Sequence, residues 1–104
     1  MGRTVIVGDF EWDEEKSQAN EKKHGFGFEE ILDMFEDPFL LETFDINHST
    51  PEEERFLALG MTHGILVVIT CFTERNGRTR IISSRRALKE EKEIYYERQK
   101  HIYD

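Results

Sequence analysis

Residues 65–87 read ILVVITCFTERNGRTRIISSRRA, and this stretch decides the fold. Residues 65–72 are apolar on both faces of an extended chain, which indicates a buried central strand. Asn76-Gly77 is a strong signal for a two-residue hairpin turn. Residues 78–84 then return as the next strand, and the short connection makes the two strands antiparallel neighbours. The stretch therefore predicts a β-hairpin at the centre of a sheet.

Further strands are expected before this hairpin. Residues 55–62 read as a strand that reaches the hairpin through a tight turn at His63-Gly64. Residues 39–46 read as another strand, and the loop that follows is rich in turn-forming residues. Residues 5–7 read as a short strand, and residues 10–12 as a second short extended piece. The pattern predicts an antiparallel sheet of three to four strands.

Helices are expected at both ends of the chain. Asp13 resembles an N-cap, and Gly25 resembles the stop of a helix that ends at Lys23 or His24. A second helix is indicated before Pro38 by one apolar stripe, formed by Phe28, Ile31, Leu32 and Phe35. The last helix is expected over residues 87–102, which are rich in Glu, Lys and Arg. The sequence thus predicts an α+β fold with two N-terminal helices, an antiparallel sheet and a C-terminal helix.

Length and cysteine content narrow the class of protein. A chain of 104 residues supports one compact core, so residues 1–104 are expected to form a single domain. The lone Cys71 excludes an internal disulfide and a cysteine-based zinc cage, which points to a reduced, cytoplasmic setting. The start of the chain does not read as a signal sequence, and the longest apolar run, residues 65–69, is too short to span a membrane.

Charge is distributed unevenly along the chain. The net charge of −8 argues against a nonspecific nucleic-acid binder. Residues 1–74, however, hold five Lys or Arg against seventeen Asp or Glu, whereas residues 75–104 hold nine against five. This asymmetry indicates a basic face on an acidic body, or a basic terminal helix that only balances the acidic front half.

Five arginines lie within residues 75–86. A guanidinium group offers a rigid fork of donors and keeps its charge, so such a density indicates a site for phosphates or carboxylates. Strict alternation would place Arg78, Arg80 and Ile82 on one face, and Thr79, Ile81 and Ser83 on the other. Arg85 and Arg86 come where the strand passes into the helix, and Ser83 and Ser84 can cap that helix or bind a phosphate. The alternative is that the arginines pair with nearby glutamates.

Acid–base candidates are fewer. Glu54 and Arg55 begin a strand, where Glu54 would orient an arginine or act as a weak base. His48 lies in the polar loop before that strand and is a candidate general acid or base. His24 is expected to stabilise a helix end, and His63 and His101 are expected to have no chemical role. The four histidines match no metal-ligand spacing, so neither a metal nor another cofactor is expected.

An ordered set of short motifs resembles the BrnT family of bacterial toxins over roughly residues 10–97. The set comprises Phe10-Glu11-Trp12-Asp13, Asn20, Lys23-His24-Gly25, Phe28-Glu29-Glu30, Phe35, Asp37-Pro38, Glu54-Arg55, Thr73-Glu74-Arg75, Arg80-Ile81-Ile82-Ser83-Ser84-Arg85-Arg86-Ala87 and Glu91 to Tyr95. The departures from the family are mild: Ser84 stands where members commonly have alanine, residues precede Phe10, and the chain is more acidic than a typical ribonuclease.

The resemblance implies a ribonuclease toxin with a RelE-like fold, encoded beside a BrnA-type antitoxin. In that family the antitoxin dimerises through a ribbon-helix-helix part that binds DNA, so this chain would meet DNA only through its partner. RNA cleavage by a 2′-hydroxyl needs a base, a cation for the phosphate and an acid. Arg80, Arg85 and Arg86, assisted by Arg55, are expected to stabilise the phosphate charge, with Glu54 or His48 as base. Arg78, Ser83 and Tyr95 are expected to contact the substrate.

Two rival functions follow from the same residues. The arginine face would also suit a noncatalytic module that binds an acidic partner protein. A DNA-binding helix–turn–helix repressor is disfavoured because both early helices are acidic and would repel phosphate.

Overall fold

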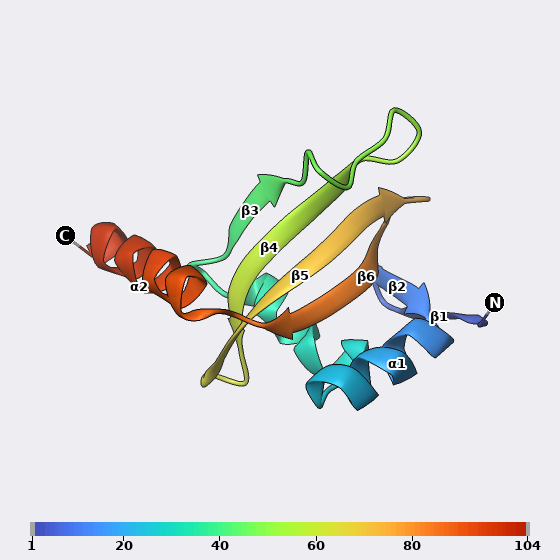
Figure 1. The fold of residues 1–104 in the computed structure, drawn as a ribbon, viewed down its shortest axis with the longest axis horizontal. Coiled ribbons are helices and arrows are strands. Elements are labelled where there is room, and N and C mark those ends of the chain that lie inside the picture. Colours follow the sequence, from blue (N-terminus) through green and yellow to red (C-terminus); the bar gives the residue numbers. More distant parts are fainter. Residues whose placement is uncertain (1, 104) are drawn as a thin grey trace.

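The computed structural model describes residues 2–103, so residues 1 and 104 of the expected domain lie outside the described residues. Its elements follow in chain order: β1 (Thr4–Val7), β2 (Phe10–Asp13), α1 (Glu14–His24), the 3₁₀ helix η1 (Phe28–Glu36), β3 (Leu41–Phe44), β4 (Arg55–Thr62), β5 (Leu66–Arg75), β6 (Arg78–Arg86) and α2 (Lys89–Tyr103). The predicted α+β class is confirmed. Figure 1 shows α1 near the N-terminal end of the long axis and α2 at the opposite end.

All six strands belong to one sheet, in the order β1-β2-β6-β5-β4-β3. The prediction of three to four antiparallel strands was therefore wrong, because the N-terminal hairpin β1–β2 adds two more. The β2 strand pairs with β6 in parallel, with Trp12 opposite Ile81, while every other pair is antiparallel. This pairing joins segments about seventy residues apart, and no local sequence pattern reports such a contact.

The central hairpins form as expected. Asn76 and Gly77 have φ angles of 53° and 78°, which is the backbone of the hairpin turn that their sequence predicts. His63 and Gly64 connect β4 to β5 with φ angles of 55° and 69°. Glycine adopts this left-handed region without steric cost. Both turns hold neighbouring strands in register.

Helix α1 begins and ends as predicted, but it is attached in an unusual way. The Asp13 carboxylate accepts from Lys16 N at 3.1 Å, and Gly25, with a φ of 90°, donates its N–H to Glu21 O. The helix has no apolar stripe, and its buried residues are Ser17 and Asn20. Polar side chains therefore fix this helix to its neighbours.

Asn20 links the end of α1 to the sheet. Its amide donates to Phe26 O at 3.0 Å, while its side-chain oxygen accepts from Ser84 N at 3.1 Å on β6. Parallel pairing with β2 extends along β6 only to Ile81. Asn20 thus satisfies a backbone donor beyond that pairing and places the last residues of α1 beside β6.

The second expected N-terminal helix is a 3₁₀ helix, so its predicted α-helical form was wrong. The buried residues of η1 are Phe28, Ile31 and Met34, three apart, which is the repeat of a 3₁₀ helix. Leu32 and Phe35, which complete the 3.6-residue stripe, are only partly buried. The Thr70 hydroxyl on β5 donates to the Met34 sulfur at 3.0 Å, and this contact holds Met34 against the sheet.

The two faces of the sheet carry different cores. One face packs against η1 through Trp12, Phe28, Val68, Phe72 and Ile81. The opposite face packs against α2 through Leu59, Val67, Ala87 and Tyr95, together with Phe39. Because these residues lie toward one end of the strands, the remainder of the second face is not covered by α2. Among residues 2–103, no helix is both long and apolar enough to cross a membrane.

A bulge in β6 changes which side chains reach that second face. Phe72 pairs with Ile81 and Cys71 with Ser83, so Ile82 is an extra residue. Strict alternation was therefore wrong for Ser83, which lies on the face of Cys71 and not on that of Ile81. Arg85 follows Ser83 onto the second face, whereas Ser84 and Arg86 turn to the face that carries η1.

Candidate functional site

The second face of the sheet is hollowed by a cavity of about 490 Å³. Its floor is apolar and consists of side chains from three strands: Leu57, Ile69, Cys71 and Ile82. Burial and the nearby Asp45 raise the pKa of the Cys71 thiol, so it stays protonated at neutral pH. The floor therefore supplies shape and low polarity rather than a nucleophile.

The wall of this cavity is polar and mostly basic. Its cationic and imidazole side chains come from four separate parts of the chain: Lys23, His24, His48, Arg55 and Arg85. Asp45 and Glu91 are the acidic residues of the wall. We call this cavity, with its apolar floor and these wall residues, the basic cavity. Cations over an apolar floor can hold an anion where water screens it weakly.

Arg85 is held in place by Glu91. Its two terminal nitrogens donate to the two Glu91 oxygens at 2.8 and 3.0 Å, and one of them also donates to Arg86 O at 3.2 Å. The hydrogen bond from Arg85 lowers the pKa of Glu91, so the pair is ionised at neutral pH. Among residues 2–103 these contacts use three of the five guanidinium N–H groups, which leaves two for an anion.

Arg55 is bound through a single nitrogen. Its Nε donates to Glu53 Oε1 at 2.7 Å, and within residues 2–103 its two terminal nitrogens have no other partner. Arg55 opens β4, and the loop before it carries His48. The start of this strand and the loop before it thus bring a guanidinium and an imidazole to the same cavity.

His48 is paired with a buried carboxylate that the sequence did not single out. Its Nδ1 lies 2.8 Å from Asp45 Oδ2, and the side chains are 67% and 7% exposed, respectively. A carboxylate accepts hydrogen bonds, so this contact favours the imidazole tautomer that carries its proton on Nδ1 and leaves Nε2 as an acceptor. In the sequence, the only sign of this pair is that Asp45 and His48 are three residues apart. That spacing brings two side chains together only in certain loop conformations, so it does not predict the contact.

Several expected site residues lie away from the basic cavity. Arg80 does not line it; its Nη1 lies 2.5 Å from Glu11 Oε2, and both side chains are largely buried. Arg86 is on the face that carries η1, where a Cβ on Gly25 would lie 3.9 Å from its Nη2. Arg78 begins β6 opposite Arg75, at the hairpin tip. Of the four arginines expected at the phosphate, the structure brings together Arg55 and Arg85.

Tyr95, which was expected to contact the substrate, lies in the core and does not line the basic cavity. It is 1% exposed, and its hydroxyl donates to Asp37 Oδ2 at 2.6 Å. Burial and this hydrogen bond raise the pKa of Tyr95 far above its usual value, so the phenol stays protonated. Ser83, in contrast, is exposed and lines the basic cavity beside Arg85.

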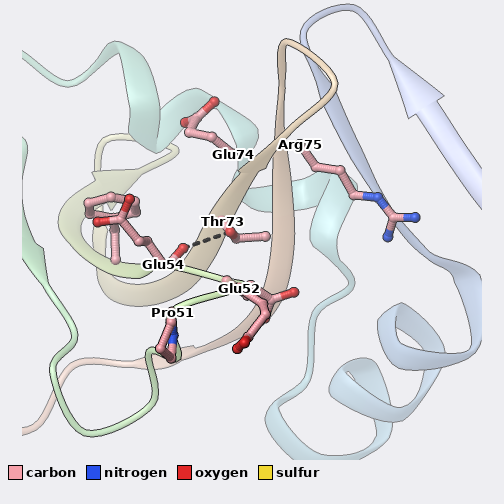
Figure 2. A pocket seen from close by; sticks show the side chains of 8 residues that line it. Pro51, Glu52, Glu54, Thr73, Glu74 and Arg75 are labelled. Atoms are coloured by element: carbon pink, nitrogen blue, oxygen red, sulfur yellow. Dashed lines mark hydrogen bonds between the residues drawn. The ribbon is translucent and has the colours of Figure 1, made fainter.

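A second hollow of about 490 Å³ lies where β4 begins and β5 ends, next to Arg55, and is acidic. Figure 2 shows Glu52, Glu54 and Glu74 around it, with Arg75 pointing outward. Thr73 Oγ1 donates to Glu54 O at 2.7 Å, which fixes this end of the strand. Glu54 thus lies apart from Arg85, and the carboxylates of this hollow would repel a phosphate.

Lys23 and His24 were not expected to contact the substrate. They reach the basic cavity because Asn20 fixes the last turn of α1 beside β6. Within the part of the chain that is described, no three His, Cys, Asp or Glu residues lie together as metal ligands.

Comparison with known proteins identifies the kind of domain to which this cavity belongs. A family model described as "Ribonuclease toxin, BrnT, of type II toxin-antitoxin system" matches residues 12–91. The solved structure of the Brucella abortus ribonuclease toxin BrnT is similar, with a TM-score of 0.57 and 25% sequence identity. That alignment covers 75% of this chain and 94% of the Brucella chain. No curated protein matches this chain.

Proposed function

This chain belongs to the BrnT family of ribonuclease toxins from type II toxin–antitoxin systems, and from that premise we propose that it cleaves RNA in the basic cavity. The observation that supports this location is the convergence of Arg55, Arg85 and His48 on one apolar-floored hollow. The acidic hollow beside Glu54 lacks such a set of cations. The basic cavity is therefore a better binding site for a phosphate than the acidic hollow.

The proposed reaction is attack of an RNA 2′-hydroxyl on the adjacent phosphorus. Arg55 and Arg85 bind the phosphate and stabilise the charge that develops on its oxygens. His48 Nε2 accepts the 2′-hydroxyl proton as general base. The bond from phosphorus to the 5′-oxygen breaks, and that oxygen takes a proton from water, which leaves a 2′,3′-cyclic phosphate and a 5′-hydroxyl. Ser83 contributes a hydroxyl beside Arg85.

Membership of the BrnT family also implies a partner protein. A type II toxin has an antitoxin partner. We propose that this partner is a BrnA-like ribbon-helix-helix protein, through which alone the chain meets DNA. We further propose that the chain acts in the cytoplasm as one RelE-like domain with a core over about residues 10–97. An adjacent reading frame for a small ribbon-helix-helix protein would support the partner, and its absence would count against it.

Cleavage of RNA by the purified chain is the first prediction. The chain should cut single-stranded RNA in the presence of EDTA, because the proposed reaction uses side chains and needs no metal. An all-2′-deoxy strand of the same sequence should stay intact, since it lacks the attacking hydroxyl. Gel electrophoresis and mass spectrometry of the product ends measure both, with 2′,3′-cyclic phosphate termini expected.

A double variant, Arg55→Ala with Arg85→Ala, is the control for contaminating nucleases. It should be inactive when it is purified in the same way. If the wild-type chain leaves RNA intact both with and without ribosomes, the enzymatic proposal is wrong. The basic cavity would then be better explained as a binding surface for an acidic partner protein.

A further inference from the structure

We propose that Asp45 is a positioning residue that orients His48 for proton transfer, an inference that rests on the proposed function. Asp45 follows directly after β3, and its carboxylate lines the basic cavity beside His48 and Arg55. Its Oδ2 accepts from His48 Nδ1 at 2.8 Å. This contact fixes the neutral imidazole in the form that carries its proton on Nδ1, so that Nε2 is free to accept a proton.

The loop that carries this pair is fixed to the strand that carries Arg55. Asp45 N donates to Arg55 O at 2.8 Å, and Arg55 N donates to Ser49 Oγ, also at 2.8 Å. Ser49 Oγ in turn donates to Asp45 O at 2.7 Å. These hydrogen bonds close a small network around the base of the loop. The imidazole and the phosphate-binding guanidinium are therefore held in one frame, as proton transfer requires.

Stability alone gives little reason for this arrangement. Asp45 is 6% exposed, and burial of a carboxylate is unfavourable unless strong partners compensate. Its side-chain partner among residues 2–103 is a largely exposed imidazole, and one hydrogen bond from a neutral ring offsets only part of the cost of burying a carboxylate. A buried carboxylate behind an imidazole at a cavity wall instead suits a base that becomes positively charged during the reaction.

The chemical role of Asp45 is to stabilise the positive charge that His48 acquires during the reaction. When the 2′-oxygen bonds to phosphorus, its proton moves to His48 Nε2 and the imidazole becomes an imidazolium. The Asp45 carboxylate stabilises that cation and keeps its own charge, because no proton passes to it. The proton on Nε2 is then released to water, which restores the neutral imidazole.

A double-mutant cycle tests the role of Asp45. We expect Asp45→Asn to lower kcat by about 30-fold and His48→Gln by about 100-fold, with KM nearly unchanged in both. Because Asp45 acts through His48, the double variant should be no slower than His48→Gln alone. Ile46→Ala is the matched control, since Ile46 is an exposed residue of the same loop that does not line the basic cavity.

Two outcomes would overturn the role of Asp45. One is an Asp45→Asn variant that cleaves RNA at the wild-type rate. The other is a further loss of similar size when Asp45→Asn is added to His48→Gln, which would indicate a structural effect. If wild type itself does not cleave RNA, the proposed function fails, and the assignment to Asp45 fails with it.

Nuclear magnetic resonance of the histidine rings gives a readout that needs neither RNA nor a folded variant. At a pH of about 8, ¹⁵N shifts of wild-type His48 should show a protonated Nδ1 and an unprotonated Nε2. The opposite tautomer would overturn the proposal. His63 offers an internal comparison, because its Nε2 lies 2.7 Å from Glu30 O and should carry the proton.

Discussion

Replacement of Arg85 by alanine is expected to lower kcat/KM for RNA cleavage by about a thousandfold. A preorganised cation at the developing phosphate charge accounts for a loss of this order. The two N–H groups of Arg85 that Glu91 and Arg86 leave unused are the donors that would be lost. The substitution also leaves the Glu91 carboxylate unpaired in the cavity wall, where it repels the substrate. Initial rates on a short fluorescent RNA measure the effect.

Arg86→Ala is the matched control for this experiment. It removes the same charge from the next residue, but its side chain lies on the face that carries η1. We expect its kcat/KM to stay within about threefold of wild type, since its exposed charge is screened from the cavity. Equal losses for Arg85→Ala and Arg86→Ala would contradict a site confined to the basic cavity and would favour the broader arginine set. Arg85 is 40% exposed, so its removal should change thermal stability little.

Replacement of Asp37 by alanine is expected to cost about 3 kcal/mol of folding stability, the largest such effect that we predict for a polar residue. Its Oδ2 accepts from Tyr95 OH at 2.6 Å and from Met61 N at 2.8 Å, and its Oδ1 accepts from Phe39 N at 2.9 Å. One carboxylate thus joins α2, β4 and the segment after η1. Alanine would leave the buried Tyr95 hydroxyl without an acceptor.

Calorimetry or circular dichroism should show the melting temperature of Asp37→Ala lowered by about 15 °C, the shift that this loss implies for a domain of this size. Tyr95→Phe, which removes one of the three hydrogen bonds, should cost about 1 kcal/mol. Glu36→Ala is the control, because Glu36 is an exposed neighbouring carboxylate. If Asp37→Ala melted at the wild-type temperature, Asp37 would not anchor α2.

The parts of the fold that short-range patterns specify were predicted from sequence. Asp13 and Gly25 bound α1, and Asn76-Gly77 forms the hairpin turn, because each signal depends only on residues nearby. The addition of β1 and β2 to the sheet was missed, because the Trp12–Ile81 pairing is distant along the chain. The 3₁₀ form of η1 was missed because Leu32 and Phe35 complete an apolar pattern with the 3.6-residue repeat of an α-helix. The residues that η1 buries are Phe28, Ile31 and Met34, which follow the three-residue repeat of a 3₁₀ helix.

The sequence singled out four of the residues that line the basic cavity, namely His48, Arg55, Ser83 and Arg85, and a β-bulge explains why Arg86 is not among them. The extra residue Ile82 sends Ser83 and Arg85 to the open face of the sheet, while it turns Arg86 to the opposite face. No residue type in β6 indicates a bulge, so the alternation of side chains along the sequence could not predict one. Arg80 was expected at the phosphate, but its partner Glu11 comes from the missed strand β2. Asp45 was missed because its contact with His48 depends on the shape of the loop.

The most direct measurement is a ¹H–¹⁵N titration of the chain with a short RNA whose 2′-hydroxyls are methylated, which can bind but cannot react. Phosphate bound between Arg55 and Arg85 should shift the resonances of the basic cavity, above all those of Arg55, Leu57, Ser83 and Arg85. The guanidinium signal of Arg75, at the acidic hollow, should stay unchanged. Shifts that gather around Glu52 and Glu74, or along the first turn of α1 at Glu14–Gln18, would contradict the basic cavity as the site of RNA cleavage. An absence of shifts at saturating RNA would contradict it as well.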